Sequence, residues 1–270
     1  MRNKSVGVLV LTLGLLFGSA SAWADQVLRQ AEITGANGKV EWLKAGASDW
    51  QPVTLNQKLD GGDKLRTGEE SSAVLTMDEG SQIDLSAGSE FAVQTLTKDS
   101  QTEQLQSVLA IMKGKMKAQV TPLKNGSSFE VETPVMVAAV RGTTFTITVN
   151  PDGSVNLTTD DGTVEIIRKG QNKFKVKIGK GKEIRVVVDP ATGDVRITSI
   201  KGDFDITGPD GAIIHLAEGQ TIIIHGGAAT FIPLTFQVSQ PPAADSFGEP
   251  IIDDAGSGSA ESLSEPPSGS

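Results

Sequence analysis

Short runs in which apolar and polar residues alternate occur along most of this chain, and they most constrain its fold. Examples are 73–77 (AVLTM), 145–149 (FTITV) and 173–178 (KFKVKI). Such alternation places the apolar side chains on one face of a β-strand. Dipeptides that favour tight turns separate the runs, as at Asp152-Gly153 and Asp161-Gly162. The pattern therefore predicts an all-β fold.

One stretch is compatible with two structures. Leu105, Val108, Leu109 and Met112 follow helical spacing, which would give a short helix over 102–112. Gly114 interrupts that spacing, and residues 115–120 alternate again. We therefore expect two strands that meet near Gly114, and the helix is the alternative.

An internal repeat marks the second half of the chain. Residues 153–166 align with residues 193–206, an offset of 40, and Gly-x-x-Ile follows each copy at 181–184 and 219–222. Repeats of this length are typical of β units that each bury one face against a neighbour. Two copies are compatible with either a β-sandwich or a short solenoid-like stack of β units.

The first 24 residues have the organisation of a secretory signal peptide. Arg2 and Lys4 precede a short apolar core over 6–17, and Ala22-Trp23-Ala24 offers a small-residue cleavage site. No later apolar run approaches the length of a transmembrane helix. We therefore expect a periplasmic or extracellular protein whose mature chain has no transmembrane segment; an uncleaved membrane anchor is the alternative.

Residues 240–270 differ from the rest in composition. They are rich in Pro, Gly, Ser and acidic residues, and no Lys or Arg follows Lys201. Such a segment cannot bury enough apolar surface to offset the entropy of ordering it. We expect a disordered acidic tail, which is either a frayed terminus or a linker.

Composition argues against several function classes. The formal net charge of −9 argues against non-specific binding of nucleic acid. The chain has no Cys, and its two His residues, His215 and His225, lie outside any recognisable nucleophile motif. Apart from Trp23 in the leader, only Trp42 and Trp50 could offer a flat aromatic platform for a sugar. We therefore expect no catalysis, no cofactor and no metal site.

Two rows of lysines are the surface feature with most functional promise. Alternation puts the lysines of each row on one face of a strand, and the rows are Lys173, Lys175 and Lys177, and Lys113, Lys115 and Lys117. They would suit an anionic partner: an acidic face of an envelope protein, a polysaccharide or a lipid headgroup. A solvated face that discourages strand pairing is the simpler interpretation. The protein's own acidic tail is a third possible occupant.

Two further motifs concern the backbone. The first is Gly62-Asp63-Lys64-Leu65-Arg66-Thr67-Gly68, and the second runs from Thr133-Pro134 to Val140-Arg141-Gly142-Thr143. Gly142 permits a bend that a side chain would block, and Pro134 belongs at a strand start because it lacks an N–H. For Arg141 we favour an internal clamp on carboxylate or carbonyl groups over a contact with a partner.

In their order and spacing, these motifs resemble the FecR domain, over residues 33–166. The resemblance implies an extracytoplasmic all-β module that binds other proteins and is not an enzyme. The best-known members are sigma-factor regulators with a cytoplasmic segment and a transmembrane helix, whereas this chain has a signal peptide in that place.

The resemblance divides the chain into a leader (1–24), a FecR-like domain (33–166), a β-rich extension (167–239) and a tail (240–270). We expect an exported, stand-alone binding module that acts in envelope sensing or assembly. A structural spacer at the surface or in a matrix is the alternative, and an enzyme is the third possibility.

Overall fold

The computed structural model describes residues 26–124, 126–168, 174–208, 211–225 and 231–234. Within these residues it contains strands and turns but no helix, so the predicted all-β fold class is confirmed. It follows that no helix in this part of the chain could cross a membrane. The expected signal peptide and the expected disordered tail lie outside the described residues.

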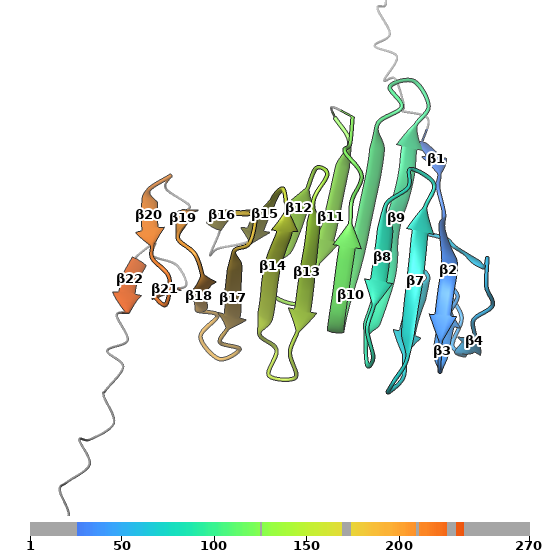
Figure 1. Cartoon of the computed structure of the whole chain (residues 1–270), viewed down its shortest axis with the longest axis horizontal. Coiled ribbons are helices and arrows are strands. Elements are labelled where there is room, and N and C mark those ends of the chain that lie inside the picture. Colours follow the sequence, from blue (N-terminus) through green and yellow to red (C-terminus); the bar gives the residue numbers. More distant parts are fainter. Residues whose placement is uncertain (1–25, 125, 169–173, 209–210, 226–230, 235–270) are drawn as a thin grey trace, which may run out of the picture. The chain divides into compact units, whose positions relative to one another are not determined.

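The strands form two sheets, called sheet A and sheet B, and one long strand takes part in both (Figure 1). All pairings are antiparallel except that between β10 and β11. In spatial order sheet A consists of β4 (Gln51–Pro52), β3 (Val40–Leu43), β6 (Lys64–Thr67), β9 (Glu90–Asp99), β10 (Leu105–Gln119), β11 (Ser128–Glu132), β12 (Val137–Val140), β15 (Thr163–Arg168), β16 (Phe174–Gly179), β19 (Phe204–Thr207) and β20 (Ile213–Leu216).

Sheet B is built in the same way. Its strands, in spatial order, are β5 (Lys58–Leu59), β2 (Ala31–Asn37), β7 (Ser72–Met77), β8 (Gln82–Leu85), β10, β13 (Thr144–Val149), β14 (Val155–Asp161), β17 (Glu183–Val188), β18 (Val195–Lys201), β21 (Thr221–Ile224) and β22 (Phe231–Leu234). The short β1 (Gln26–Leu28) pairs with the end of β9 in sheet A.

The long strand β10 resolves the ambiguity at residues 102–119, and the helix alternative is wrong. Residues 105–113 pair with β9 in sheet A, whereas residues 114–119 pair with β8 and β13 in sheet B. Gly114 lies at the change of sheet with a φ of 86°. A Cβ there would lie 2.6 Å from Cα of Ser89, so only glycine fits. Register shifts beside Leu109 and Lys113 interrupt the alternation, which explains the helix-like spacing.

The 40-residue offset corresponds to two hairpins, one in each sheet. Hairpin β13–β14 lies in sheet B, β15–β16 in sheet A, β17–β18 in sheet B and β19–β20 in sheet A. The first hairpin of each sheet pairs with an earlier strand, β13 with β10 and β15 with β12, and each later hairpin pairs with the preceding hairpin of its own sheet. Both sheets therefore continue without interruption across residues 166 and 167.

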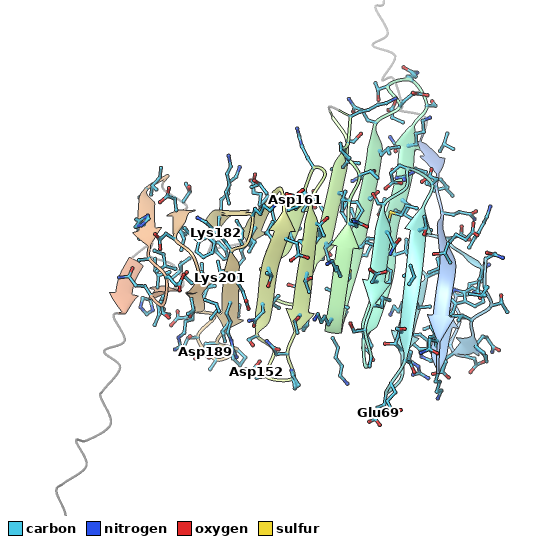
Figure 2. All side chains as sticks on the ribbon, viewed as in Figure 1. Glu69, Asp152, Asp161, Lys182, Asp189 and Lys201 are labelled. Atoms are coloured by element: carbon cyan, nitrogen blue, oxygen red, sulfur yellow. The ribbon has the colours of Figure 1, made fainter. Side chains whose placement is uncertain are left out.

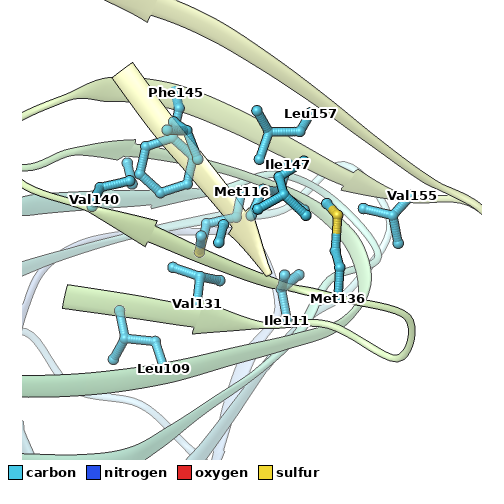
Figure 3. Packing of buried hydrophobic residues seen from close by; sticks show 14 of the residues in the cluster. Leu109, Ile111, Met116, Val131, Met136, Val140, Phe145, Ile147, Val155 and Leu157 are labelled. Atoms are coloured by element: carbon cyan, nitrogen blue, oxygen red, sulfur yellow. The ribbon is translucent and has the colours of Figure 1, made fainter. Parts of the chain in front are cut away.

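The inner faces of the two sheets share one apolar core. Leu109 and Val131 of sheet A, with Phe145, Ile147 and Leu157 of sheet B, are fully buried (Figure 3). The same cluster extends from Ala31 in β2 to Ile224 in β21. Burial of this apolar surface is the main stabilising contribution in a chain with no disulfide.

Candidate functional site

A groove of about 320 Å³ lies on the outer face of sheet A, above β11, β12, β15 and β16. Its position follows from one small residue. Ala139 of β12 is flanked in the sheet by Glu130 of β11 and Glu165 of β15. Because the Ala side chain is much shorter than its neighbours, the outer face is hollowed along β12. We call this feature the Ala139 groove.

Charged side chains of both signs line the Ala139 groove. Glu165 is already neutralised by an ion pair with Lys175. Arg141, at the end of β12, is exposed, and Lys177 of β16 is also exposed. Within the described residues the side chains of Arg141 and Lys177 form no hydrogen bond and no ion pair. Glu130 adds one acidic group, so the groove presents two available cations and one available anion.

The two predicted lysine rows do not form one site. Lys175 and Lys177 lie on the outer face of sheet A, whereas Lys115 and Lys117 lie on the half of β10 that belongs to sheet B. Lys117 is paired with Asp160 at 2.9 Å. Lys113 lies opposite Glu90 in sheet A, and Lys173 lies outside the described residues. Only Lys177 combines exposure with a place in the Ala139 groove.

The first backbone motif supports a corner of sheet A. Asp63 is only 1% exposed, and its two carboxylate oxygens accept hydrogen bonds from the backbone N–H groups of Ala45 (2.8 Å) and Asp60 (3.0 Å). Gly62 has a φ of 94°, and its N–H donates to the carbonyl of Val93 at 2.7 Å. These residues hold the backbone in place and do not line the groove.

The second motif also shapes the backbone, with two differences from expectation. Gly142 has a φ of 86°, and buried Thr143 donates its hydroxyl to the carbonyl of Thr163 at 3.0 Å. Pro134 does not begin a strand: it lies in the turn between β11 and β12, where the Thr133 hydroxyl accepts the N–H of Met136 at 3.0 Å. The Thr-Pro pair therefore forms the hairpin turn itself.

Arg141 is the more important correction. Its exposed side chain forms no hydrogen bond with the described residues, so it is not the internal clamp that its apolar neighbours suggested. Its position is explained by the bend at Gly142, where β12 ends and the chain leaves sheet A. The side chain therefore projects at the rim of the Ala139 groove.

The internal clamp is Arg29, which the sequence did not single out. Arg29 is 5% exposed, and its guanidinium contacts Asp78, Glu79 and Ser107. These partners lie 49, 50 and 78 residues away along the chain. No local pattern connects residues so far apart, so only the tertiary structure reveals the cluster.

The two His residues each lie beside an Asp carboxylate. Nδ1 of His215 lies 3.0 Å from Asp205, and Nδ1 of His225 lies 3.1 Å from Asp194. In the described part of the chain, no three His, Cys, Asp or Glu side chains gather as metal ligands would. Asp205 lies on β19, beside the strand of His215, whereas Asp194 and His225 lie just outside the neighbouring strands β18 and β21.

One segment of the chain is similar to a known protein family. Residues 63–165 match the family model described as FecR protein. No curated protein matches the sequence. Two crystal structures of a proposed anti-sigma factor from Parabacteroides distasonis are similar, with 15% and 14% sequence identity and TM-scores of 0.38 and 0.37.

Each of these matches covers 58% of this chain and 60% of the solved chain. The chain therefore spans less than two thirds of the length of the solved structures that it matches. The family match includes β11, β12, β13, β14 and the first half of β15, and therefore Ala139, Arg141 and Gly142. The match to the FecR model is confined to residues 63–165 of the 270 residues of the chain.

Proposed function

We propose that this protein is an exported, non-enzymatic binding module that contacts a partner protein of the cell envelope through the Ala139 groove. One observation carries the proposal. Arg141 and Lys177 have exposed side chains without a partner in the described residues, and they flank a groove of which Arg141, but not Lys177, lies in the segment that matches the FecR model. Protein partners are recognised by complementary charge around a shaped surface.

The residue inventory supports a binding role over catalysis. The chain has no Cys and only two His residues, and each His bonds to an Asp on the surface of the sheets. The residues around the Ala139 groove offer cations, carboxylates and small side chains. Such a set can select a partner by charge, and among the described residues no Ser or Thr hydroxyl that lines the groove is hydrogen-bonded to a carboxylate or a His.

A role in envelope sensing or assembly is the biological part of the proposal. It rests on the FecR domain and on the signal-peptide pattern of residues 1–24. An acidic polysaccharide or a lipid headgroup could also meet Arg141 and Lys177. The experiment below separates these partners from a protein.

Site-specific photo-crosslinking in the native host tests the proposal. A benzophenone amino acid is placed at Ala139, and the matched control carries it at Thr146 on the outer face of sheet B. We expect one discrete crosslinked protein from position 139, its loss when Arg141→Glu is added, and none from position 146. Equal crosslinking from both positions, or none from either, would contradict the groove as the protein-binding face.

A second readout covers the anionic alternatives. Binding of the purified protein to vesicles containing anionic lipid, and to an acidic polysaccharide, is compared for the native chain and for Lys177→Ser. Binding that depends on Lys177, together with no crosslinked protein, would assign the groove to an anionic polymer or surface.

A structural spacer is the second candidate function, and the stacked hairpins favour it. Hairpins alternate between sheets A and B from β13 to β22, so the same unit is repeated along the sheets. A spacer would tolerate Arg141→Glu in the cell, whereas a binding module would not.

A further inference from the structure

The last strand of sheet A leaves its outer edge unpaired among the described residues. In the β19–β20 hairpin the N–H of Gly208 donates to the carbonyl of Ala212 at 2.8 Å. Hydrogen-bonded pairs alternate in an antiparallel ladder, so Ile206–Ile214 and Phe204–Leu216 are the next bonded pairs. The backbone N–H and C=O groups of Ile213 and His215 therefore point away from β19, toward the edge.

The other outermost strands carry features that discourage strand pairing. On the N-terminal side, β4 and β5 are two residues long and contain Pro52 and Lys58 respectively, and β1 has three residues. At the other end of sheet B, β22 contains Pro233, which has no N–H to donate. Short strands, prolines and lysines are the usual protection of a sheet edge. Among the described strands, β20 is an edge strand that has none of them.

The side chains of β20 offer apolar contacts to an added strand on both faces of the sheet. Ile213 is 68% exposed on the outer face, and Ile214 is partly buried against the core on the inner face. A strand added beside β20 would place alternate side chains next to Ile214 and Leu216, at the end of the core. Its remaining side chains would lie beside Ile213 and His215.

The charge of the residues around β20 indicates which kind of strand would bind at its edge. From Gly202 to Ser270 the chain has ten acidic residues and no Lys or Arg. Asp203, Asp205 and Glu218 are exposed close to β20 in sequence and pairing. Lys201 lies at the end of β18, and Lys182 donates to the backbone carbonyl of Asp203 (Figure 2). None of the three carboxylates forms an ion pair with a Lys or Arg of the described residues; Asp205 bonds to His215. A second copy of this chain would bring two acidic segments together, which costs free energy.

We propose that the edge of β20 binds an extended, basic segment of a partner protein by strand addition. Backbone bonds to Ile213 and His215 would hold the segment, as in other cases in which a peptide extends a sheet. Alternate apolar residues of the segment cover Ile214 and Leu216. Its Lys or Arg residues lie beside Ile213 and His215 on the outer face, one strand away from Asp205, which bonds to His215. The site is separate from the Ala139 groove, and neither depends on the other.

A designed peptide tests the proposal with the purified protein. The probe is a fluorescent ten-residue peptide in which Val and Lys alternate. Two controls are a Val/Glu peptide and a peptide of the same Val/Lys composition with the two residue types in separate blocks. We expect the alternating Val/Lys peptide to bind about tenfold or more tightly than either control, and to slow amide hydrogen exchange at Ile213 and His215.

Two matched variants locate the site. Both Ile213→Lys and Ile200→Lys replace an exposed Ile, which is 68% exposed in β20 and 43% exposed in β18. We expect Ile213→Lys to weaken binding about tenfold, because a like charge now lies on the edge. Ile200→Lys should leave binding unchanged. His215→Pro, which removes an edge N–H, should abolish the exchange protection.

Several results would overturn the proposal. One is that either control peptide binds as tightly as the alternating Val/Lys peptide. Another is that Ile213→Lys binds the alternating peptide as tightly as the native protein does. A native dimer that Ile213→Lys makes monomeric would assign the edge to a second copy. Slow exchange at Ile213 and His215 in the free monomer would assign it to another segment of the same chain. A failed crosslink at Ala139 would count against the groove and would not bear on binding at the β20 edge.

Discussion

The Nε group of Arg29 lies 3.0 Å from Oδ1 and 3.1 Å from Oδ2 of Asp78. Nη1 of the same guanidinium donates to the hydroxyl of Ser107 at 3.1 Å, and Nη2 pairs with Glu79. Asp78 and Glu79 belong to the β7–β8 turn of sheet B, and Ser107 belongs to the part of β10 in sheet A. The Arg29 cluster therefore joins the beginning of the described chain to both sheets.

Loss of the Arg29 side chain should destabilise the fold strongly. We expect Arg29→Ala to lower the free energy of unfolding by about 3 kcal/mol, since Glu79 would be left largely buried without its cation. The matched control is Arg185→Ala, which breaks an exposed pair with Asp152 and should cost less than about 1 kcal/mol. Denaturant unfolding measures both, and equal losses would contradict the clamp assigned to Arg29.

The two carboxylates of the Arg29 cluster should titrate in opposite directions. Burial raises the pKa of Glu79, and the charge of Arg29 only partly opposes this effect. Burial also acts on Asp78, but its hydrogen bonds to Arg29 and Glu79 hold the pKa of Asp78 below the ordinary value of 3.8. Glu79 therefore binds a proton more readily in the folded state, and Asp78 binds one less readily.

These shifts predict the pH dependence of Glu79→Gln. The contribution of Glu79 to stability grows as pH falls through its raised folded pKa toward 4.5, and Gln has no such titration. The stability of the native protein relative to Glu79→Gln should therefore rise on acidification from neutral pH to 4.5. Asp78 loses its contribution only as pH falls below 3.8. A difference that decreases on acidification, measured by denaturant unfolding, would show the opposite shift.

Asp63→Asn should weaken the corner that Asp63 supports. Both oxygens of the native carboxylate accept backbone N–H groups, whereas Asn would point an N–H₂ group at one of them. We expect a loss of about 2 kcal/mol. At Asp189 the side chain accepts an exposed turn N–H at 2.8 Å, so Asp189→Asn should cost less than about 1 kcal/mol. Thermal unfolding of the two variants is the test, and similar melting temperatures would rule out this role.

Gly142→Ala should cost more than Gly153→Ala, although both glycines have a positive φ, of 86° and 78°. A Cβ at Gly142 would lie 2.8 Å from Cα of Pro122, but at Gly153 it would meet nothing within 4 Å. Backbone strain alone costs about 1–2 kcal/mol at either position. The collision with Pro122 should add about 1–3 kcal/mol at Gly142. If the two variants unfold at the same denaturant concentration, close packing at Gly142 has no energetic effect.

Local pattern was sufficient for the strands and for several turns. Alternation predicted β13 and β16 because a strand exposes successive side chains to opposite faces, whatever its neighbours are. The bend at Gly142 was also predictable, because a backbone conformation that leaves no room for a side chain requires glycine at that position. The expectations for residues 1–24 and 240–270 rest on composition alone.

Pairing between distant strands decided the rest. The lysines of β10 and β16 look equivalent in sequence, yet they lie on different sheets because β10 changes sheet at Gly114. The same long-range pairing buries Arg29 against Asp78 and leaves Arg141 exposed beside Ala139. A local pattern specifies which face of a strand is apolar, but the neighbours of each strand follow from contacts between residues far apart in the chain.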